Sequence, residues 1–353
     1  MNNSNKDLAV SVIWKDERLF FLDQTLLPNE LVQEEQLTVE QVWDSIKRLK
    51  VRGAPAIGIA GAYGLIVSIR DDVSLTPQEL LVEIKKNADY LNSSRPTAVN
   101  LSWALKRLTA KAEALFDKGL STRKIIIGLT EEAVLIHEED KILCRRIGEN
   151  GLPLIKEGMG ILTHCNAGAL ATSELGTATA PMYLAHDKGI SFKVYADETR
   201  PLLQGARLTS WELQQAGIDV TLNCDDMAAS LMAEGLIDMV IVGTDRVAAN
   251  GDVANKIGTM GVAILASYFN IPVYVACPSS TIDLDTAIGA DIEIEERGED
   301  EVTFFGMRRT GPEGIAVRNP AFDVTPNEMV AGLITEKGII RAPYDVNLKK
   351  MFS

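Results

Sequence analysis

Short apolar segments alternate with helical patterns from about residue 151 to the end of the chain. The segments are residues 160–164, 191–196, 219–223, 239–242, 272–276 and 321–325. The helical patterns between them include residues 178–188, 209–216, 226–234 and 258–269. Repetition of strand, helix and strand predicts a mainly parallel, doubly wound sheet. No G-x-G-x-x-G motif follows the first strand, so the dinucleotide-binding fingerprint is absent.

The first 150 residues have a different pattern. Residues 8–27 alternate loosely between apolar and polar side chains, which is typical of a small hairpin or meander. Helices are then expected at residues 38–50, 57–69, 77–91, 101–116, 121–138 and 140–148. The fold class is therefore α/β: a mainly helical N-terminal domain (residues 1–150) with a short β-hairpin start, then a Rossmann-like catalytic domain (residues 151–353) with a doubly wound parallel sheet.

The composition limits the partners and the location. The chain has a net charge of −14, with 49 acidic against 35 basic residues, which argues against a nucleic-acid partner. The four cysteines form no C-x-x-C pair and match no zinc-ligand spacing. The chain does not begin with an apolar signal segment, and its longest apolar run, residues 57–69, is shorter than the roughly 20 residues of a membrane span. We therefore expect a cytoplasmic protein with no membrane partner.

The stretch 239–260 begins as a strand and continues into a loop rich in charged and amide side chains. Ligands of open α/β sheets bind at the carboxyl ends of the strands. We therefore expect Asp245 to take part in chemistry, with apolar neighbours that raise the pKa of its carboxyl to that of a general acid. Asn255 and Lys256, at the start of the next helix, would hold an anionic or hydroxylated substrate. The alternative is that Asp245 pairs with the arginine that follows it or caps a turn.

Cysteine side chains also follow predicted strands. Cys165 comes after the first strand, where a nearby helix N-terminus can lower the pKa of a thiol. The alternative is a small buried hydrophobe, which is our interpretation of Cys224 and Cys277. His164 points to the opposite side of the strand from Cys165, which favours a structural histidine. Cys165 and Asp245 together indicate a proton-transfer site that uses neither a metal nor a nucleotide.

Two arginines in the first half are candidates for binding an anion. Arg52, Gly53 and Ala54 precede Pro55, which suits the first turn of a helix. Free N–H groups and the helix dipole favour an anion there, and an arginine can bind two phosphate oxygens at once. Arg95 lies in a loop rich in serine and proline and is the second candidate. The alternative is that both arginines are solvated surface residues.

Several motifs run through most of the chain. They are Arg52-Gly-Ala-Pro-Ala-Ile57, Leu162-Thr-His-Cys-Asn-Ala-Gly168, Asp197-Glu-Thr-Arg-Pro201 with Gln204-Gly-Ala-Arg207, Gly243-Thr-Asp-Arg246 with Asn250-Gly-Asp252 and Asn255-Lys-Ile-Gly-Thr259, and Asn319-Pro-Ala-Phe-Asp-Val-Thr-Pro326. In this order they resemble the methylthioribose-1-phosphate isomerase family of methionine salvage. The resemblance extends from about residue 11 to 345.

The wider superfamily contains ribose-1,5-bisphosphate isomerases and regulatory subunits of the nucleotide exchange factor for eukaryotic translation initiation. The regulatory subunits generally lack the cysteine and aspartate pair, so Cys165 and Asp245 favour an enzyme. The bisphosphate isomerases share that pair. A related isomerase and a non-catalytic subunit that senses a sugar phosphate or nucleotide therefore both stay open as alternatives.

The resemblance implies an aldose–ketose isomerase that converts 5-methylthio-D-ribose 1-phosphate to 5-methylthio-D-ribulose 1-phosphate without a cofactor. Asp245 would protonate the ring oxygen, and Cys165 would act as the base of a phosphoenolate route or stabilise a hydride shift. The family also implies a homodimer and a site in the cleft between the domains. The residues implied for phosphate and sugar binding are Arg52, Gly53, Ala54, Arg95 and Lys256, with Gln204 and Asn255 on hydroxyl groups.

Overall fold

A computed structural model describes residues 10–96 and 98–352 of the chain. The start of the chain, where the sequence suggests no signal segment, lies outside these residues. Contacts group the described residues into two compact units: a helical unit of residues 10–143 and Ala169–Gly176, and an α/β unit of Cys144–Gly168 and residues 177–352. A division into domains at residue 150 stays a proposal, and the contacts assign two segments differently, residues 144–150 and Ala169–Gly176.

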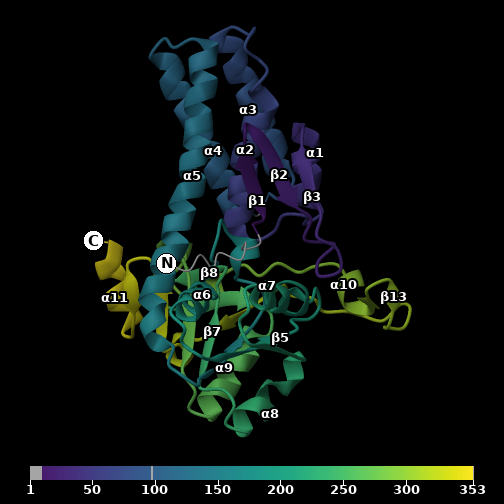
Figure 1. Cartoon of the computed structure of the whole chain (residues 1–353), viewed down its shortest axis with the longest axis vertical. Helices are drawn as coiled ribbons and strands as arrows, with labels where there is room; N and C mark the ends of the chain where they lie inside the picture. Colours follow the sequence, from purple (N-terminus) through teal and green to yellow (C-terminus); the bar gives the residue numbers. More distant parts are fainter. Residues whose placement is uncertain (1–9, 97, 353) are drawn as a thin grey trace. The chain divides into compact units, whose positions relative to one another are not determined.

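The helical unit combines a small sheet with long helices (Figure 1). Its antiparallel strands, in the order β1-β2-β3, are Val12–Lys15, Arg18–Leu22 and Gln33–Gln36. The first two strands are the expected hairpin, and β3 was not predicted. The helices are α1 (Val39–Lys47), α2 (Ala54–Ile69), α3 (Pro77–Ser93), α4 (Val99–Asp117) and α5 (Thr122–Gly151), the last of which continues into the α/β unit.

Local sequence explains why these helices form where they do. Thr38 accepts a hydrogen bond from the amide of Gln41 and caps α1, and Thr76 forms a capping box with Glu79 at the start of α3. Helix α2 is apolar on all sides, and 13 of its 16 residues are buried, so it forms the centre of the unit. This confirms that the apolar run 57–69 is a buried helix.

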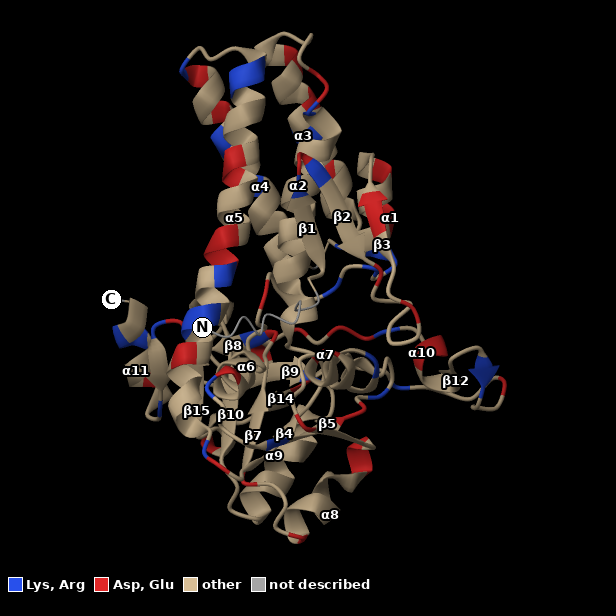
Figure 2. Cartoon of the chain, in the orientation of Figure 1, with Lys and Arg blue, Asp and Glu red and all other residues tan. Residues whose placement is uncertain are grey.

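Helix α5 differs from the prediction, which expected two helices separated near residue 139. The structure shows one helix of 30 residues. Residues 129–147 contain neither glycine nor proline, so nothing interrupts the helix there. Asp140 does not cap a new helix, because its carboxylate accepts a hydrogen bond from the backbone amide of Ser173 at 2.9 Å. Acidic and basic side chains are interspersed along this helix (Figure 2), so it presents no continuous basic stripe.

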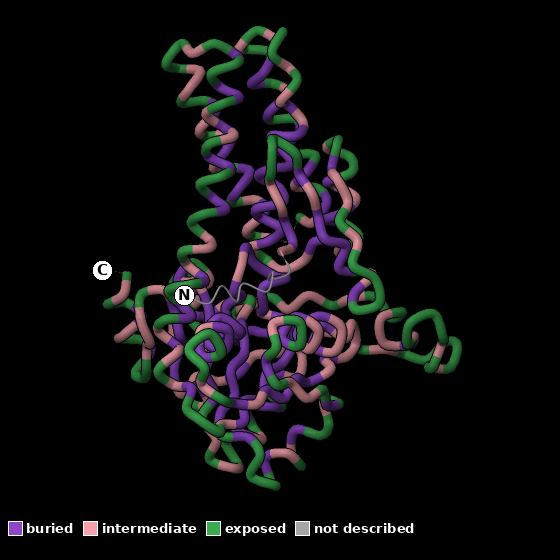
Figure 3. The backbone as a smooth tube through the Cα atoms, viewed as in Figure 1, coloured by how far each residue is buried: buried purple, intermediate pink, exposed green. Residues whose placement is uncertain are grey.

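The α/β unit is built on a seven-stranded sheet in the order β16-β15-β10-β7-β4-β5-β6. The strands are parallel except β16, which is antiparallel to β15. Strands β4, β7, β10 and β15 are buried at every position (Figure 3), as expected for parallel strands covered on both faces. The strands in chain order are β4 (Gly160–Thr163), β5 (Lys193–Asp197), β6 (Val220–Asn223), β7 (Met239–Val242), β10 (Val273–Ala276), β15 (Gly332–Thr335) and β16 (Gly338–Ile340).

The fold class predicted from the sequence is confirmed. The helices of this unit are α6 (Ala180–Asp187), α7 (Ser210–Gln215), α8 (Ala228–Ala233), α9 (Thr259–Tyr268), α10 (Asp300–Thr303) and α11 (Tyr344–Phe352). In the chain as described, no helix has the combination of length and apolar character needed to cross a membrane.

A second sheet was not anticipated. It has the order β11-β8-β9-β14 and comprises Ile282–Asp283, Arg246–Ala248, Val253–Lys256 and Phe322–Thr325, while β12 (Phe304–Phe305) and β13 (Arg308–Arg309) form a separate hairpin. The prediction placed residues 243–256 in a loop, and residues 321–325 in the main sheet. Both were wrong because β9 is stabilised by antiparallel pairing with β14, which lies about 70 residues later in the chain.

Candidate active site

The order of the strands reverses between β4 and β7. From β4 the chain proceeds outward through β5 and β6, then returns to place β7 on the other side of β4. Such a reversal leaves an opening at the carboxyl ends of the two central strands, where ligands of open α/β sheets bind. The two ends are close in space, because a Cβ atom added at Gly243 would lie 2.5 Å from the Cβ atom of Ala167.

Cys165 lies at the carboxyl end of β4, two residues after the strand ends. Its residue is 9% exposed, and its backbone has a φ of +63°, a region that non-glycine residues seldom adopt. Cys277 is buried as expected, whereas Cys224 is exposed, which contradicts our interpretation of it as a buried hydrophobe. Cys224 follows β6, the edge strand of the sheet, so fewer elements cover it.

Asp245 lies three residues beyond β7, the neighbour of β4. Its amide donates to the carbonyl of Ala254 at 3.0 Å, and the hydroxyl of Thr244 donates to the same carbonyl at 2.8 Å. These bonds hold the turn into the β8–β9 hairpin. Asp245 itself is exposed, whereas the sequence led us to expect apolar neighbours around it.

Gln204 is buried directly after the β5 loop, at the start of a π-helical turn, Gly205–Thr209. Its residue is 6% exposed, and its Oε1 atom has no hydrogen-bond partner among the residues that the structure describes. A buried amide oxygen without a partner is unfavourable by about 1–3 kcal/mol. A ligand that donates a hydrogen bond at this position would remove that penalty.

Asn255 and Lys256 end strand β9 and do not start helix α9, contrary to the prediction. Both are buried, and the side-chain Nδ2 of Asn255 donates to the hydroxyl of Thr259 at 3.0 Å. The Nζ atom of Lys256 donates to the carbonyl of Ala321 at 3.0 Å and lies 4.3 Å from the centre of the Phe322 ring. The lysine is thus held by a carbonyl and an aromatic face, both of which stabilise a cation.

The segment 319–326, a motif to which the sequence assigned no role, contacts Lys256. Besides holding Lys256, it carries Asp323, whose carboxylate accepts hydrogen bonds from the amides of Gly258 and Met260 at 2.8 and 3.0 Å. Asp323 therefore caps helix α9 from a distant strand. The motif was the available signal, but its partner could not be identified without the pairing of β9 with β14.

In the helical unit, Arg52, Gly53 and Ala54 form the start of α2 as predicted. Gly53 is the N-cap residue with a φ of +89°, and an added Cβ atom would lie 2.4 Å from the carbonyl oxygen of Ala171, so only glycine fits. Arg95 lies between α3 and α4. Helices α2 and α4 start at the same end, since Gly58 contacts Asn100 and Gly61 contacts Leu101. Two helix N-termini therefore combine to favour an anion at this end.

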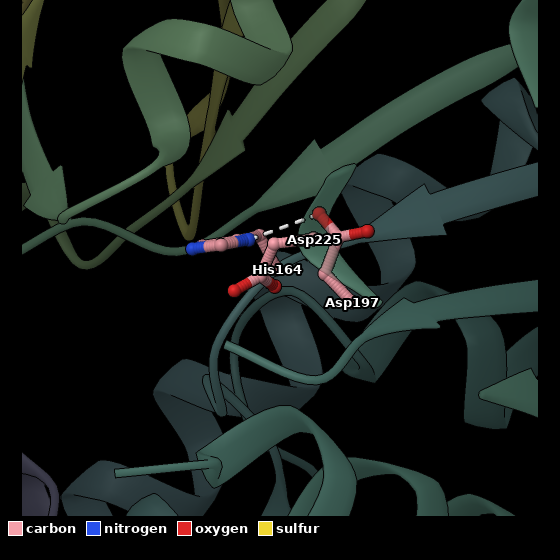
Figure 4. A group of neighbouring side chains, drawn as sticks. All are labelled: His164, Asp197 and Asp225. Carbon is pink, nitrogen blue, oxygen red and sulfur yellow. Dashed lines mark hydrogen bonds and ion pairs between the residues drawn. The ribbon is translucent and has the colours of Figure 1, made fainter. Parts of the chain in front are cut away.

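His164, Asp197 and Asp225 form a cluster that the sequence did not suggest (Figure 4). Their potential metal-ligand atoms lie within 4.8 Å of one another. The Nε2 atom of His164 lies 2.8 Å from the carbonyl of Ile257 and must donate to it, while Nδ1 lies 2.9 Å from Asp197. Both oxygens of Asp225 accept backbone amides, those of Thr199 and Arg200, at 2.7 Å.

These hydrogen bonds account for the cluster as a structural network. Because Nε2 of His164 carries a proton, the histidine and Asp197 must share one further proton between Nδ1 and the carboxylate. Burial lowers the pKa of His164, but the hydrogen bond and the charge of Asp197 outweigh it, so the pKa is raised. The expected structural role of His164 fits this arrangement, although the two carboxylates beside it were not foreseen.

The chain is similar to known proteins over almost its whole length. Residues 50–342 match the Initiation factor 2 subunit family. A 5-deoxyribose 1-phosphate isomerase of Bacillus cereus is 56% identical over 347 residues, which cover 98% of this chain and 99% of that protein. One of Clostridium botulinum is 56% identical over 345 residues, covering 97% and 98%.

Two solved structures have nearly the same fold. The 5-methylthioribose 1-phosphate isomerase of Pyrococcus horikoshii has a TM-score of 0.94 and 41% identity, covering 100% of this chain and 98% of that one. A structure described as the delta subunit of translation initiation factor eIF-2B from A. fulgidus has a TM-score of 0.90 and 45% identity, covering 97% and 98%. Structures described as a sugar-phosphate isomerase and as an initiation-factor subunit therefore share this fold, and only the residues of the site can discriminate between the two functions.

Proposed function

This chain belongs to the Initiation factor 2 subunit family, and we propose that it is the aldose–ketose isomerase of a 5-deoxypentose 1-phosphate. Its preferred substrate would be 5-deoxyribose 1-phosphate, and its product the corresponding ketose 1-phosphate. The support is 56% identity, over 98% of the chain, to a 5-deoxyribose 1-phosphate isomerase. Recognition of this family from sequence motifs alone is confirmed by the family match.

One observation in the structure carries the proposal. Cys165 and Asp245 follow β4 and β7, the two adjacent parallel strands at which the strand order reverses. A residue with a thiol and a residue with a carboxyl group therefore follow adjacent strands at the position where ligands of open α/β sheets bind. Both groups can exchange protons, which suits an isomerisation in which only hydrogen and a ring bond are rearranged.

The first step would open the furanose ring. As the bond between C1 and the ring oxygen breaks, Asp245 would donate a proton to that oxygen. The carboxyl must be protonated to do so, and Asp245 is exposed. Bound substrate would therefore have to exclude water from this carboxyl and raise its pKa.

The second step would move hydrogen from C2 to C1, while the C2 hydroxyl gives its proton to the carboxylate that Asp245 became in the first step, and C2 becomes the ketone. In one route Cys165 removes the C2 proton to form a phosphoenolate, which is then protonated at C1. In the other, hydride passes directly from C2 to C1 and Cys165 stabilises the transition state. Turnover in deuterated water separates them, since deuterium at C1 of the product supports the enolate and its absence supports the hydride shift.

Binding roles are assigned to each unit separately. In the α/β unit we propose that Gln204 and Asn255 bind hydroxyl groups and that Lys256 binds sugar or phosphate oxygens. The orphaned Oε1 atom of Gln204 and the burial of Lys256 support these roles. In the helical unit we propose an anion site, suited to a phosphate group, at the two helix starts. It comprises Arg52, Gly53, Ala54 and Arg95.

The test is conversion of purified substrate, followed by proton and phosphorus NMR. We expect ketose from 5-deoxyribose 1-phosphate, at an unchanged rate after treatment with a chelator, since no step requires a metal or nucleotide. Asp245→Asn and Cys165→Ala should each reduce kcat by about 100- to 10,000-fold while substrate still binds. Absence of ketose with every pentose 1-phosphate tested, despite binding, would instead support a sugar-phosphate-sensing subunit.

A second candidate substrate is 5-methylthioribose 1-phosphate, the predicted substrate, in methionine salvage. It is favoured by the similarity, at a TM-score of 0.94, to a structure with that activity in its name. The two sugars differ only in the C5 substituent, so the ratio of their kcat/KM values decides between them. Ribose 1,5-bisphosphate is the third compound to compare. A homodimer is also a proposal, and sedimentation of the purified chain would test it.

A further inference from the structure

The backbone of Cys165 is held in an uncommon conformation. Its φ of +63° lies in the left-handed region, and Thr199, in the neighbouring strand-end loop, has a φ of +65°. A β-branched residue is strongly disfavoured there. Such conformations persist only where surrounding contacts impose them, and they are frequent where a side chain must be aimed. The contacts around Cys165 can be named individually.

Two buried threonine hydroxyls bind the two sides of the Cys165 backbone. The Oγ1 atom of Thr199 accepts a hydrogen bond from the Cys165 amide at 2.8 Å, and the Oγ1 atom of Thr209 donates one to the Cys165 carbonyl at 2.6 Å. Thr199 is 0% exposed and Thr209 is 1% exposed, so water does not compete for either bond. Both polar groups of this residue are thus occupied by side chains and not by a strand or helix.

Each hydroxyl also makes a second hydrogen bond. Thr199 donates to the backbone carbonyl of Asp197 at 3.1 Å, and Thr209 accepts from the side-chain Nδ2 of Asn166 at 3.0 Å. Each hydroxyl therefore has one donor and one acceptor, which defines its orientation. Thr209 is the last residue of the π-helical turn Gly205–Thr209, a rare local structure that is enriched at functional sites.

We propose that Thr199 and Thr209 are positioning residues for the thiol of Cys165. Together they hold the Cys165 peptide in the left-handed conformation, and this sets the direction of its Cα–Cβ bond, from which the thiol extends. Neither hydroxyl needs to touch substrate. Loss of one hydroxyl would let the peptide relax towards negative φ and turn the thiol away from C1 and C2 of the sugar. The kinetic consequence rests on the proposed function, whereas the effect on the thiol itself does not.

The variants are Thr199→Val and Thr209→Val, which keep the shape and remove the hydroxyl, and the corresponding serine variants, which keep the hydroxyl. Thr335→Val is the matched control. Thr335 is 0% exposed, and its hydroxyl also has one donor and one acceptor, the amide of Lys337 and the carbonyl of Gly338. It lies on β15, which is separated from β7 by β10.

Two measurements are made on each full-length variant. Steady-state kinetics should show kcat lowered by about 10- to 100-fold for the valine variants, with KM little changed, because a misplaced reacting group affects the chemical step. Alkylation by iodoacetamide, mapped by mass spectrometry, should be faster at Cys165 in the valine variants than in the wild type. Cys165 is only 9% exposed, and loss of a threonine hydrogen bond should make its thiol more accessible. The exposed Cys224 is the internal reference. The serine variants and Thr335→Val should match the wild type in both measurements.

The proposal is overturned if both valine variants retain wild-type kcat and alkylation rate, if Thr335→Val loses as much activity, or if serine does not restore function. Circular dichroism checks the fold, and if one valine variant is unfolded the other decides. An inactive wild type would refute the proposed function only, because the alkylation of Cys165 in the variants would still test the positioning.

Discussion

His137, on helix α5, provides a test of how burial controls stability in the helical unit. Its Nδ1 atom lies 3.1 Å from the hydroxyl of Tyr63, and the Tyr63 ring stacks on Trp14 with centroids 4.8 Å apart. The Nε2 atom is buried and has no hydrogen-bond partner within residues 10–96 and 98–352. Burial, assisted by the charge of Lys141, lowers the pKa of His137 from its usual 6.5 to about 4.

The sign and size of the effect follow from linkage. Below pH 6.5 the unfolded chain binds a proton at His137 that the folded state excludes. The unfolding free energy therefore has its full value above that pH and decreases as the pH falls towards about 4. The full shift corresponds to about 3 kcal/mol, at roughly 1.4 kcal/mol per pKa unit. Between about pH 7.5 and pH 5 the expected loss from His137 is about 2 kcal/mol.

The assay is urea unfolding of the whole chain at several pH values, followed by tryptophan fluorescence. Trp14, Trp43 and Trp103 lie in the helical unit, so the signal reports mainly on its unfolding. The variant His137→Gln stays neutral, and its amide can still bind the hydroxyl of Tyr63. The difference in unfolding free energy between wild type and variant should therefore change by about 2 kcal/mol over this pH range.

The control is His186→Gln, at an exposed position at the end of α6. It should reproduce the pH dependence of the wild type. Equal losses of unfolding free energy in the wild type and His137→Gln would refute the argument, because they would assign the pH dependence to other groups.

Three further variants test the candidate site. Asp323→Ala removes the cap of α9 and should reduce the unfolding free energy by about 1 kcal/mol and also lower kcat/KM. The control Thr76→Ala, at the cap of α3, should reduce stability by a similar amount and leave activity unchanged. Equal activity of the two variants would contradict a role for the 319–326 segment. Gln204→Leu should leave stability unchanged or raised, because an orphaned oxygen is removed, while KM rises about tenfold, the equivalent of one hydrogen bond; a wild-type KM would remove Gln204 from the site. Arg52→Ala should weaken competitive inhibition by inorganic phosphate, and unchanged inhibition would place the phosphate elsewhere.

Much of this architecture was readable from the sequence because its signals are local. Strands β4, β7 and β10 are continuous apolar runs, and such runs are typical of parallel strands buried on both faces. The start of α2 was evident from a glycine followed by a proline one residue into the helix. Cys165 and Asp245 stood out because each comes directly after such a strand, and the doubly wound pattern implies that strand ends share one edge of a sheet.

Other features depended on contacts between residues far apart in the chain. Strand β9 exists because of β14, so Asn255 and Lys256 lie in a sheet where local pattern suggested a loop and a helix start. Asp197 and Asp225, the residues that cluster with His164, come from two other strand ends. No local sequence pattern around these aspartates indicates that they lie close to a histidine.

The sequence by itself determined the family and the doubly wound sheet, and it indicated Cys165 and Asp245 as candidate reacting residues, since periodicity and motif order are properties of neighbouring residues. Only the tertiary structure decided how these groups are held. It showed that Asp245 is exposed, that Oε1 of Gln204 has no hydrogen-bond partner in the described part of the chain, and that two threonines bind the Cys165 backbone. Burial and hydrogen-bond partners are decided by which segments pack together, and that information appears only once the chain has folded.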